Sequence, residues 1–221
     1  NDLLNGGEGA PLTPIYHQLL VSQKKINLPV CILNIGGISN ITLIKKPIES
    51  LEIFSKDIGP GNCLIDSWIR KNSNKKFDRD GLLAVSGNKN EIIFEQAQEL
   101  YRNRKFKEKT SLDTNDFDIS FSRGLSLEDG ASTLTEFTAS ILGESISIFL
   151  NKTNPIDIFI CGGGRKNKTL VEALKKNLPS SINLKLIEEL DLNGDFIESQ
   201  AFAFLSIRSI MNLPITFPST T

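Results

Sequence analysis

The chain begins with a carboxylate beside a glycine-dense loop. Asp2 precedes the run Asn5-Gly6-Gly7-Glu8-Gly9-Ala10-Pro11-Leu12, which is too specific for an ordinary turn. Glycine has no Cβ, so such a loop lets a neighbouring carboxylate approach a water molecule closely. A carboxylate with a raised pKa can then remove a proton from that water. We therefore predict Asp2 to be a general base, although without this loop it would pass for a surface residue.

A second glycine cluster joins two apolar, β-branched runs, residues 29–35 and 38–44. This pattern predicts a β-hairpin with a tight turn at Gly36-Gly37 that needs positive φ. Such a tip can turn successive backbone N–H groups toward one anion, and a plain hairpin turn is the alternative. The candidate phosphate-binding residues of this segment are Asn34, Gly36, Gly37 and Asn40.

A third cluster, Cys161-Gly162-Gly163-Gly164, follows a mostly apolar run and precedes a predicted helix. Backbone amides and a helix N-terminus in this position can bind a nucleotide, and a purely structural turn is the alternative. A Rossmann dinucleotide motif starting at Gly162 would need glycine where Asn167 stands, so that class is disfavoured. The candidate nucleotide-binding residues are Gly162, Gly163, Gly164 and Asn167.

The segment Asp57-Ile58-Gly59-Pro60-Gly61-Asn62 is predicted to end a strand and to open a helix. Asp57 could hold a ligand hydroxyl there, and the first N–H groups of the helix could face a phosphate or a sugar. Capping of that helix by Asp57 is the alternative. The candidate residues of this substrate loop are Asp57, Gly59, Gly61 and Asn62.

Two further ionisable residues bear on the chemistry. Glu198 lies in the first turns of the last predicted helix, where it could serve catalysis or simply favour the helix dipole. His17 is the only histidine, so any His-containing triad would have to use it, and a site with several histidine ligands is excluded. We expect a structural role for His17 and predict no protein ligand for a metal.

The composition is that of an ordinary globular protein. The hydrophobic fraction is 39%, and no window approaches the roughly eighteen uninterrupted apolar residues of a membrane span. The formal net charge of −1 creates no extended positive field, which argues against nucleic acid as a partner. Three cysteines without a CxxC pair indicate a reducing environment, so we expect a cytoplasmic protein.

The apolar pattern predicts one α/β domain with an insertion. Strands are expected at residues 29–35, 38–44, 51–56, 156–161 and 183–187. Helices are expected from Gly61 onward and at residues 91–102, 126–150, 167–177 and 195–211. Residues 72–125, polar and rich in Lys and Asn around one helix, form the insertion. In the long helix we expect an apolar stripe made of Leu134, Phe137, Ile141 and Ile148.

The order and spacing of these motifs resemble one family, the anhydro-N-acetylmuramic acid kinases. Its pattern is Asp, three residues, Gly-Gly-x-Gly-Ala-Pro-Leu-x-Pro and then His, which the chain supplies from Asp2 to His17. The resemblance covers essentially the whole chain. It continues through residues 33–42, 57–66, 133–139, 161–164 and 194–204.

The resemblance implies the actin-like ATPase fold of the acetate and sugar kinase, Hsp70 and actin superfamily. This ribonuclease H-like α/β fold has a mixed central sheet flanked by helices, with a largely helical insertion at about residues 72–125. Residues 1–221 would form the second, C-terminal kinase domain. The family's phosphate loop belongs to a first domain and does not occur in these residues. We therefore expect a fragment that is inactive alone.

The implied reaction converts 1,6-anhydro-N-acetylmuramic acid, ATP and water to N-acetylmuramic acid 6-phosphate and ADP in peptidoglycan recycling. Asp2 matches the family's catalytic base, Glu198 would help to place the attacking water, and Gly6 and Gly7 would belong to the substrate loop. The expected cofactors are ATP and Mg²⁺, the latter held mainly through phosphates and water. The sugar is the expected partner, and a homodimer is left open.

Three departures from the family pattern fall within the motifs: Glu8 replaces the usual Gln, Ser39 the usual Ala and Ile58 the usual Thr. Loss of the hydroxyl at position 58 could remove one ligand contact. Two rival functions are another sugar kinase of the same superfamily and a non-catalytic sensor of cell-wall fragments, because substrate identity depends on the site and not on the fold.

Overall fold

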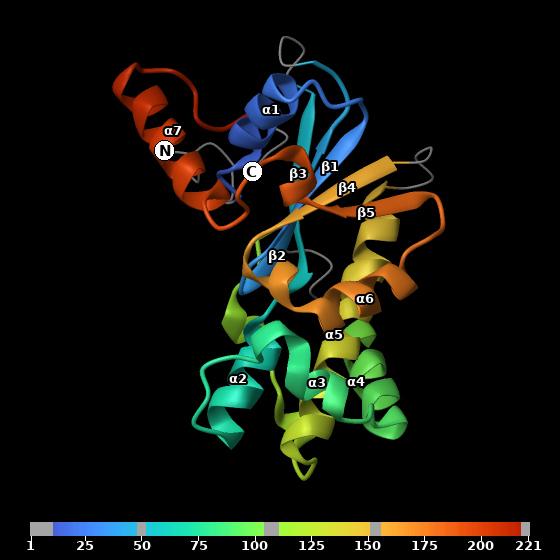
Figure 1. Ribbon diagram of the computed structural model, residues 1–221. Helices are drawn as coiled ribbons and strands as arrows, with labels where there is room; N and C mark the ends of the chain where they lie inside the picture. Colours follow the sequence, from blue (N-terminus) through green and yellow to red (C-terminus); the bar gives the residue numbers. More distant parts are fainter. Residues whose placement is uncertain (1–10, 48–51, 104–110, 151–155, 218–221) are drawn as a thin grey trace.

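A computed structural model describes residues 11–47, 52–103, 111–150 and 156–217 of the chain. Its centre is a five-stranded sheet in the order β3-β2-β1-β4-β5 (Figure 1). The strands are β1 (Val30–Ile35), β2 (Ile38–Ile44), β3 (Ile53–Pro60), β4 (Ile156–Cys161) and β5 (Ile182–Leu186). All five predicted strands are present, and the main difference is that β3 runs on to Pro60.

The sheet is mixed. β2 pairs antiparallel with β1 and with β3, whereas β4 pairs parallel with β1 and β5 pairs parallel with β4. Among the strands of the described residues, β2 is therefore the one that runs against the others. This order and these directions make the ribonuclease H-like sheet of actin-like ATPases, which confirms the predicted fold class.

Seven α-helices lie in the described residues: α1 (Pro14–Gln23), α2 (Cys63–Asn72), α3 (Leu82–Ser86), α4 (Glu91–Asn103), α5 (Leu127–Leu150), α6 (Lys168–Asn177) and α7 (Ile197–Ile210). Helix α1 was not predicted. The proline at its first turn is a local start signal. The helix lacks an apolar stripe, however, because the polar side chains of His17 and Gln18 are buried in it along with Leu20.

The sheet is covered on both faces, and β1 contributes to both cores. Val30 and Ile32 pack in a cluster with α1 and α7, whereas Cys31 and Leu33 pack in a cluster with α2, α5 and α6. Successive side chains of a strand point to opposite faces, which explains this division. Figure 1 shows α1 and α7 on one side of the sheet and α5 and α6 on the other. Burial on both faces is why β1 reads as a continuous apolar run.

Helix α5 is a single long helix, as predicted. Its first turn is capped by the Ser126 hydroxyl, which accepts a hydrogen bond from the backbone N–H of Asp129 at 3.0 Å. The predicted stripe is buried at Leu134, Phe137 and Ile141, but Ile148 is 70% exposed. Near its carboxyl end the helix is covered only along the row Leu142, Ile146 and Leu150. The expectation for Ile148 was therefore wrong.

The described part of the insertion between α2 and α5 contains α3 and α4, and Ala84 of α3 and Ala97 of α4 are buried in the same cluster as Leu134 of α5. Trp68 of α2 donates a hydrogen bond from Nε1 to the carbonyl of Leu127 at 2.9 Å. The apolar row of α2, which includes Leu64 and Ile69, is buried as expected. The insertion is thus fixed to the same core as the sheet.

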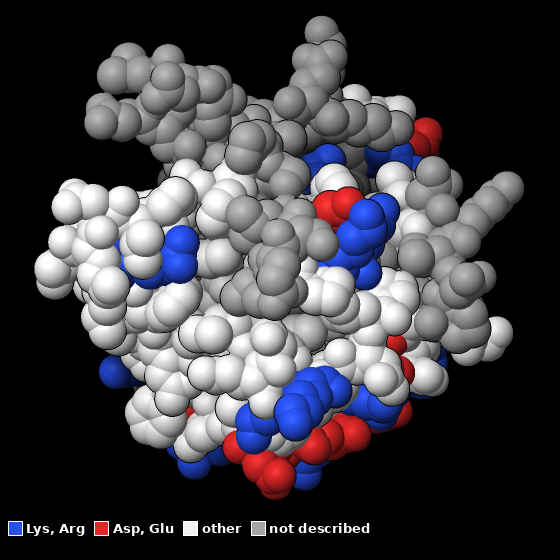
Figure 2. Space-filling view, turned by 90° about the horizontal axis from the view of Figure 1, so that it is seen from above, with Lys and Arg blue, Asp and Glu red and all other residues white. Residues whose placement is uncertain are grey.

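The helices and the surface charges bear on possible contacts with membranes and charged partners. None of the described helices is long and apolar enough to cross a membrane. On the face seen in Figure 2, Lys and Arg side chains lie next to Asp and Glu side chains. That face therefore carries neighbouring charges of both signs.

Candidate active site

The hairpin tip is bonded to the start of α2. The carbonyl of Gly36 accepts from the backbone N–H of Asn62 at 2.7 Å and from its side-chain Nδ2 at 3.0 Å. The carbonyl of Gly37 accepts from the N–H groups of Gly61 at 2.8 Å and Cys63 at 3.2 Å. The N–H groups of Gly61, Asn62 and Cys63 are therefore used within the protein, and a contact between the first turn of α2 and a phosphate or sugar stays a prediction.

The turn itself also differs from the prediction. Positive φ among the described glycines occurs at Gly59, Gly81, Gly124 and Gly162, so the Gly36-Gly37 turn does not use it. The position that requires glycine is Gly61, which faces the hairpin tip from the start of α2. A Cβ on Gly61 would collide with the carbonyl of Gly36.

Asp57 lies within β3 and not at the start of α2. Its side chain is buried, and Oδ2 accepts a hydrogen bond from the backbone N–H of Leu112 at 2.9 Å. The capping alternative for Asp57 was therefore wrong. One carboxylate oxygen holds the insertion against the sheet, and a contact between this carboxylate and a ligand stays a prediction.

The glycine run forms the predicted turn between β4 and α6. Gly162 has φ +79°, and a Cβ there would collide with the Asn34 side chain and the carbonyl of Ile35. Asn167 caps α6, because its Oδ1 accepts from the N–H of Leu170 at 3.0 Å. The capping bond uses one lone pair of the side-chain oxygen of Asn167, and its side-chain NH₂ group can donate to a ligand.

Arg165 holds this turn in place, although no motif or spacing in the sequence had pointed to it. Its nearly buried guanidinium donates to the carbonyl of Gly162 at 2.9 Å, to Glu188 at 2.7 Å and to Asp195 at 2.9 Å. Partial burial acts to raise the pKa of the Glu188 carboxyl, but the hydrogen bond and charge of Arg165 together with backbone hydrogen bonds leave that pKa lowered. Hydrogen bonds from Lys166 and then Arg165 lower the pKa of Asp195. Three segments distant in sequence meet at one cation.

A cavity of about 260 Å³ opens beside this turn, at the carboxyl ends of β1 and β4, where α/β proteins commonly bind ligands. It brings together three of the predicted site regions: Asn34, the glycine run and Glu198. Oδ1 of Asn34 faces the thiol of Cys161 at 3.8 Å, which leaves its Nδ2 for a ligand. The described residues that line the 260 Å³ cavity are Thr13, His17, Asn34, Cys161, Gly162, Gly163, Gly194, Asp195, Ile197 and Glu198.

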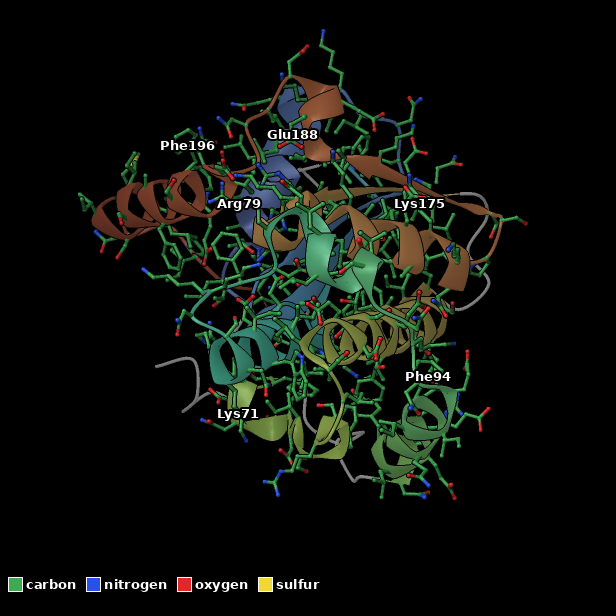
Figure 3. All side chains as sticks on the ribbon, turned by 60° about the horizontal axis from the view of Figure 1, so that its bottom comes forward. Lys71, Arg79, Phe94, Lys175, Glu188 and Phe196 are labelled. Carbon is green, nitrogen blue, oxygen red and sulfur yellow. The ribbon has the colours of Figure 1, made fainter. Side chains whose placement is uncertain are left out.

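A second cavity of about 480 Å³ lies on the other side of the same turn, and Gly163 borders both. It has one aromatic side chain, Phe77, which is 51% exposed, and two cations, Arg79 and Lys166. Figure 3 labels Arg79 on the turn ahead of α3, Glu188 in the short 3-10 helix after β5, and Phe196 at the start of α7. The described lining residues are Asn62, Ile65, Asp66, Phe77, Asp78, Arg79, Asp80, Gly163, Lys166 and Asn167.

The other predicted residues fall into two groups. Seven of them, all within the part of the chain that the structure describes, do not line either cavity: Gly36, Gly37, Asn40, Asp57, Gly59, Gly61 and Gly164. Asp2, Gly6 and Gly7 lie outside the described residues. No group of three His, Cys, Asp or Glu side chains suited to a metal ion occurs in the described ranges.

His17 is almost fully buried, and its Nδ1 lies 2.9 Å from the Thr42 hydroxyl, which fits the expected structural role. Burial lowers the pKa of the imidazole to about 4. The ordinary value in an unfolded chain is about 6.5. The folded protein therefore holds this ring neutral at neutral pH.

This shift predicts a loss of stability in mild acid. As pH falls from about 6.5 to 4, the unfolded state takes up a proton that folded His17 excludes, so the free energy of unfolding decreases. At 1.36 kcal/mol per pKa unit the decrease reaches about 3 kcal/mol. Urea unfolding of the complete protein across this range should show the decrease, and His17→Asn should remove most of it. Equal slopes in both proteins would contradict the prediction.

The strand order and directions define a ribonuclease H-like α/β protein, with one cavity at the carboxyl ends of β1 and β4 and a second that shares Gly163 with it. A family model described as anhydro-N-acetylmuramic acid kinase matches residues 1–221. The chain belongs to the anhydro-N-acetylmuramic acid kinase family, which confirms the membership expected from the motifs.

Individual relatives agree. The anhydro-N-acetylmuramic acid kinase of Pelagibacter ubique is 50% identical over 224 residues, which is 100% of this chain and 59% of that protein. The protein of the same name from Zymomonas mobilis is 39% identical over 100% of this chain and 58% of its own length. The chain thus spans somewhat more than half the length of these relatives.

One solved structure shares the general shape: the activator of the 2-hydroxyisocaproyl-CoA dehydratase from Clostridium difficile with bound ADPNP. It is 13% identical, with a TM-score of 0.49 over 91% of this chain and 68% of that one. The fold assignment rests on the strand order and directions and not on this likeness.

Proposed function

We propose that the complete protein containing this chain phosphorylates 1,6-anhydro-N-acetylmuramic acid at O6, with ATP as donor and water opening the anhydro bridge. The family match over all 221 residues carries this proposal. In the reaction, water adds to C1, the bond from C1 to O6 breaks, and O6 attacks the γ-phosphate with loss of ADP. We place this reaction in the cytoplasm, and a homodimer stays a prediction.

The two cavities support a division of the ligands. We assign the adenosine part of ATP to the 480 Å³ cavity, where Phe77 can stack on the base and Arg79 and Lys166 can attract phosphate. We assign the sugar to the 260 Å³ cavity beside Glu198. Gly163 borders both, and a residue without a Cβ lets a phosphate approach the backbone there.

The chemistry needs a base for the attacking water. We assign this role to Asp2 and the placing of the water to Glu198, whose side chain lines the sugar cavity. Nδ2 of Asn34 is placed to donate to a ligand oxygen in the same cavity. Gly36, Gly37, Gly61 and Asn62 act here by joining the hairpin to α2. The carbonyls of the first two accept hydrogen bonds from Gly61, Asn62 and Cys63.

Mg²⁺ fits this proposal as an ion bound through ATP. Mg²⁺ in nucleotide sites usually keeps several waters and binds through substrate phosphates, and we propose the same mode here. When bound, it would neutralise charge on the transferring phosphoryl group. The backbone around Gly163 would orient those phosphates from the protein side.

The test is turnover of the complete protein with ATP and the anhydro sugar in ¹⁸O-water, with ADP and sugar measured by mass spectrometry. We expect N-acetylmuramic acid 6-phosphate with one ¹⁸O at C1. Unlabelled product incubated in the same water controls for exchange. ADP with ¹⁸O only in inorganic phosphate would mean plain ATP hydrolysis and would contradict the proposal.

A matched substrate separates the rival sugar kinase. N-acetylmuramic acid has the same ring and substituents without the anhydro bridge. Faster phosphorylation of this sugar, without incorporation of ¹⁸O, would identify an ordinary sugar kinase. No turnover of either sugar by folded protein would favour the non-catalytic sensor.

A further inference from the structure

The hydrogen bonds below His17 fix which ring nitrogen carries the proton. A carbonyl can only accept, so in the 3.0 Å contact between Ser55 Oγ and the carbonyl of Ile41 the hydroxyl of Ser55 must donate. That hydroxyl has one proton, so in its 3.3 Å contact with Thr42 the donor is Thr42. The hydroxyl of Thr42 is then also used, and Nδ1–H of His17 must donate across the 2.9 Å contact.

The other nitrogen is consequently an acceptor. Burial lowers the pKa of His17 to about 4, so at neutral pH the ring carries one proton, on Nδ1, and Nε2 has a lone pair. His17 is 1% exposed and lines the 260 Å³ cavity. Among the described residues its one hydrogen bond is to Thr42. Because His17 lines the cavity, this lone pair can accept a hydrogen bond from a donor that fills the cavity.

The charged groups that share the cavity cannot supply that donor. Glu198 and Asp195 also line it, and ionised carboxylates only accept hydrogen bonds. The oxygens of an ionised phosphate group carry no proton, so they also only accept hydrogen bonds. A hydroxyl group can donate, and a sugar carries several.

We infer that Nε2 of His17 accepts a hydrogen bond from a hydroxyl of the sugar, and that His17 thereby determines how the sugar is oriented in the 260 Å³ cavity. The inference rests on the proposed function for the identity of the ligand. A chain of hydrogen bonds through Thr42 and Ser55 to the backbone of β2 holds the ring in this tautomer. The phosphate oxygens of ATP, which can only accept hydrogen bonds, are disfavoured next to Nε2 of His17.

Nuclear magnetic resonance tests the tautomer without any need for activity. Complete protein labelled with ¹⁵N at histidine is recorded free and with saturating anhydro sugar, and the His17 signal is assigned by its loss in His17→Asn. We expect a protonated Nδ1 and an unprotonated Nε2, with a shift of the Nε2 signal when sugar binds. A protonated Nε2 in the free protein, or an unmoved signal when sugar is bound, would overturn the inference.

Kinetics then separate a ligand contact from a structural role. His17→Asn keeps an N–H donor for Thr42 and loses Nε2, so KM for the sugar should rise about tenfold, the equivalent of one hydrogen bond of about 1.4 kcal/mol. KM for ATP should stay within about twofold. Thr42→Val should also raise the sugar KM, and Thr42→Ser, which restores the hydroxyl, should return it toward wild type.

The outcomes distinguish this inference from the proposed function. An active wild-type enzyme with an unchanged sugar KM in both His17→Asn and Thr42→Val would overturn the role of His17 alone. A wild-type protein that neither binds nor turns over the sugar would overturn both proposals. If His17→Asn does not fold, Thr42→Val and Thr42→Ser still give the comparison.

Discussion

Asp2→Asn in the complete protein should lower kcat by about 10²- to 10⁴-fold, the usual contribution of a general base. The substitution keeps the size of the side chain and removes its ability to take a proton. Binding of ATP should be nearly unchanged, because we assign the nucleotide to a cavity whose described lining includes Phe77 and Lys166. Initial rates of ADP release at saturating sugar measure the first effect, and nucleotide titration measures the second.

Asp191→Asn is the matched control for Asp2→Asn. It makes the same chemical change at an exposed residue that lines neither cavity. Asp191 has φ +54°, a conformation that Asn also adopts readily, so the fold should tolerate the change. Wild-type rates for Asp191→Asn are expected. A kcat for Asp2→Asn within about threefold of wild type would exclude Asp2 as the base.

Arg165→Met should lower the free energy of unfolding by about 2–3 kcal/mol, the range for hydrogen bonds that involve a charged group. Methionine retains a long apolar stem, so packing is largely kept while three hydrogen bonds are lost. Glu188 and Asp195 are 43% and 47% exposed and regain water, which keeps the loss below that of a fully buried ion pair. Urea unfolding measures the change.

Lys166→Met is the matched control for stability. Lys166 also pairs with Asp195, at 2.6 Å, but its side chain is 56% exposed. An exposed ion pair of this kind contributes about 0–1 kcal/mol. Equal, small losses in both variants would show that Arg165 does not hold the glycine turn. We also expect Arg165→Met to weaken ATP binding, because the carbonyl of Gly162 loses its donor.

Local signals predicted most of the secondary structure. β4 has the bounds expected from its apolar run, and α5 begins where Ser126 supplies a cap. Prediction failed where tertiary contacts overrode such signals. Gly59 and Pro60 look like strand breakers, yet they pair with Ser39 and Ile38 of β2 and extend β3. Helix α1 was missed because its burial does not follow an amphipathic pattern.

The site was predictable in part. The motif pattern located Asn34, the glycine run and Glu198, and the structure places all three on one cavity. The hairpin tip was interpreted as an anion site, whereas its two carbonyls bind the start of α2. A glycine pair in the sequence indicates a turn. It does not say which backbone groups of that turn bond within the protein and which are left for a ligand.

By itself, the sequence determined the family, the fold class and the order of the strands and of the helices other than α1 and α3. These depend on residue types and spacings along the chain, which are local properties. Only the tertiary structure decided which groups meet. Arg165 bonds to residues 23 and 30 positions away, and His17 bonds to one 25 positions away. No spacing rule encodes such contacts, because they form only when the packed sheet brings separate segments within hydrogen-bonding distance.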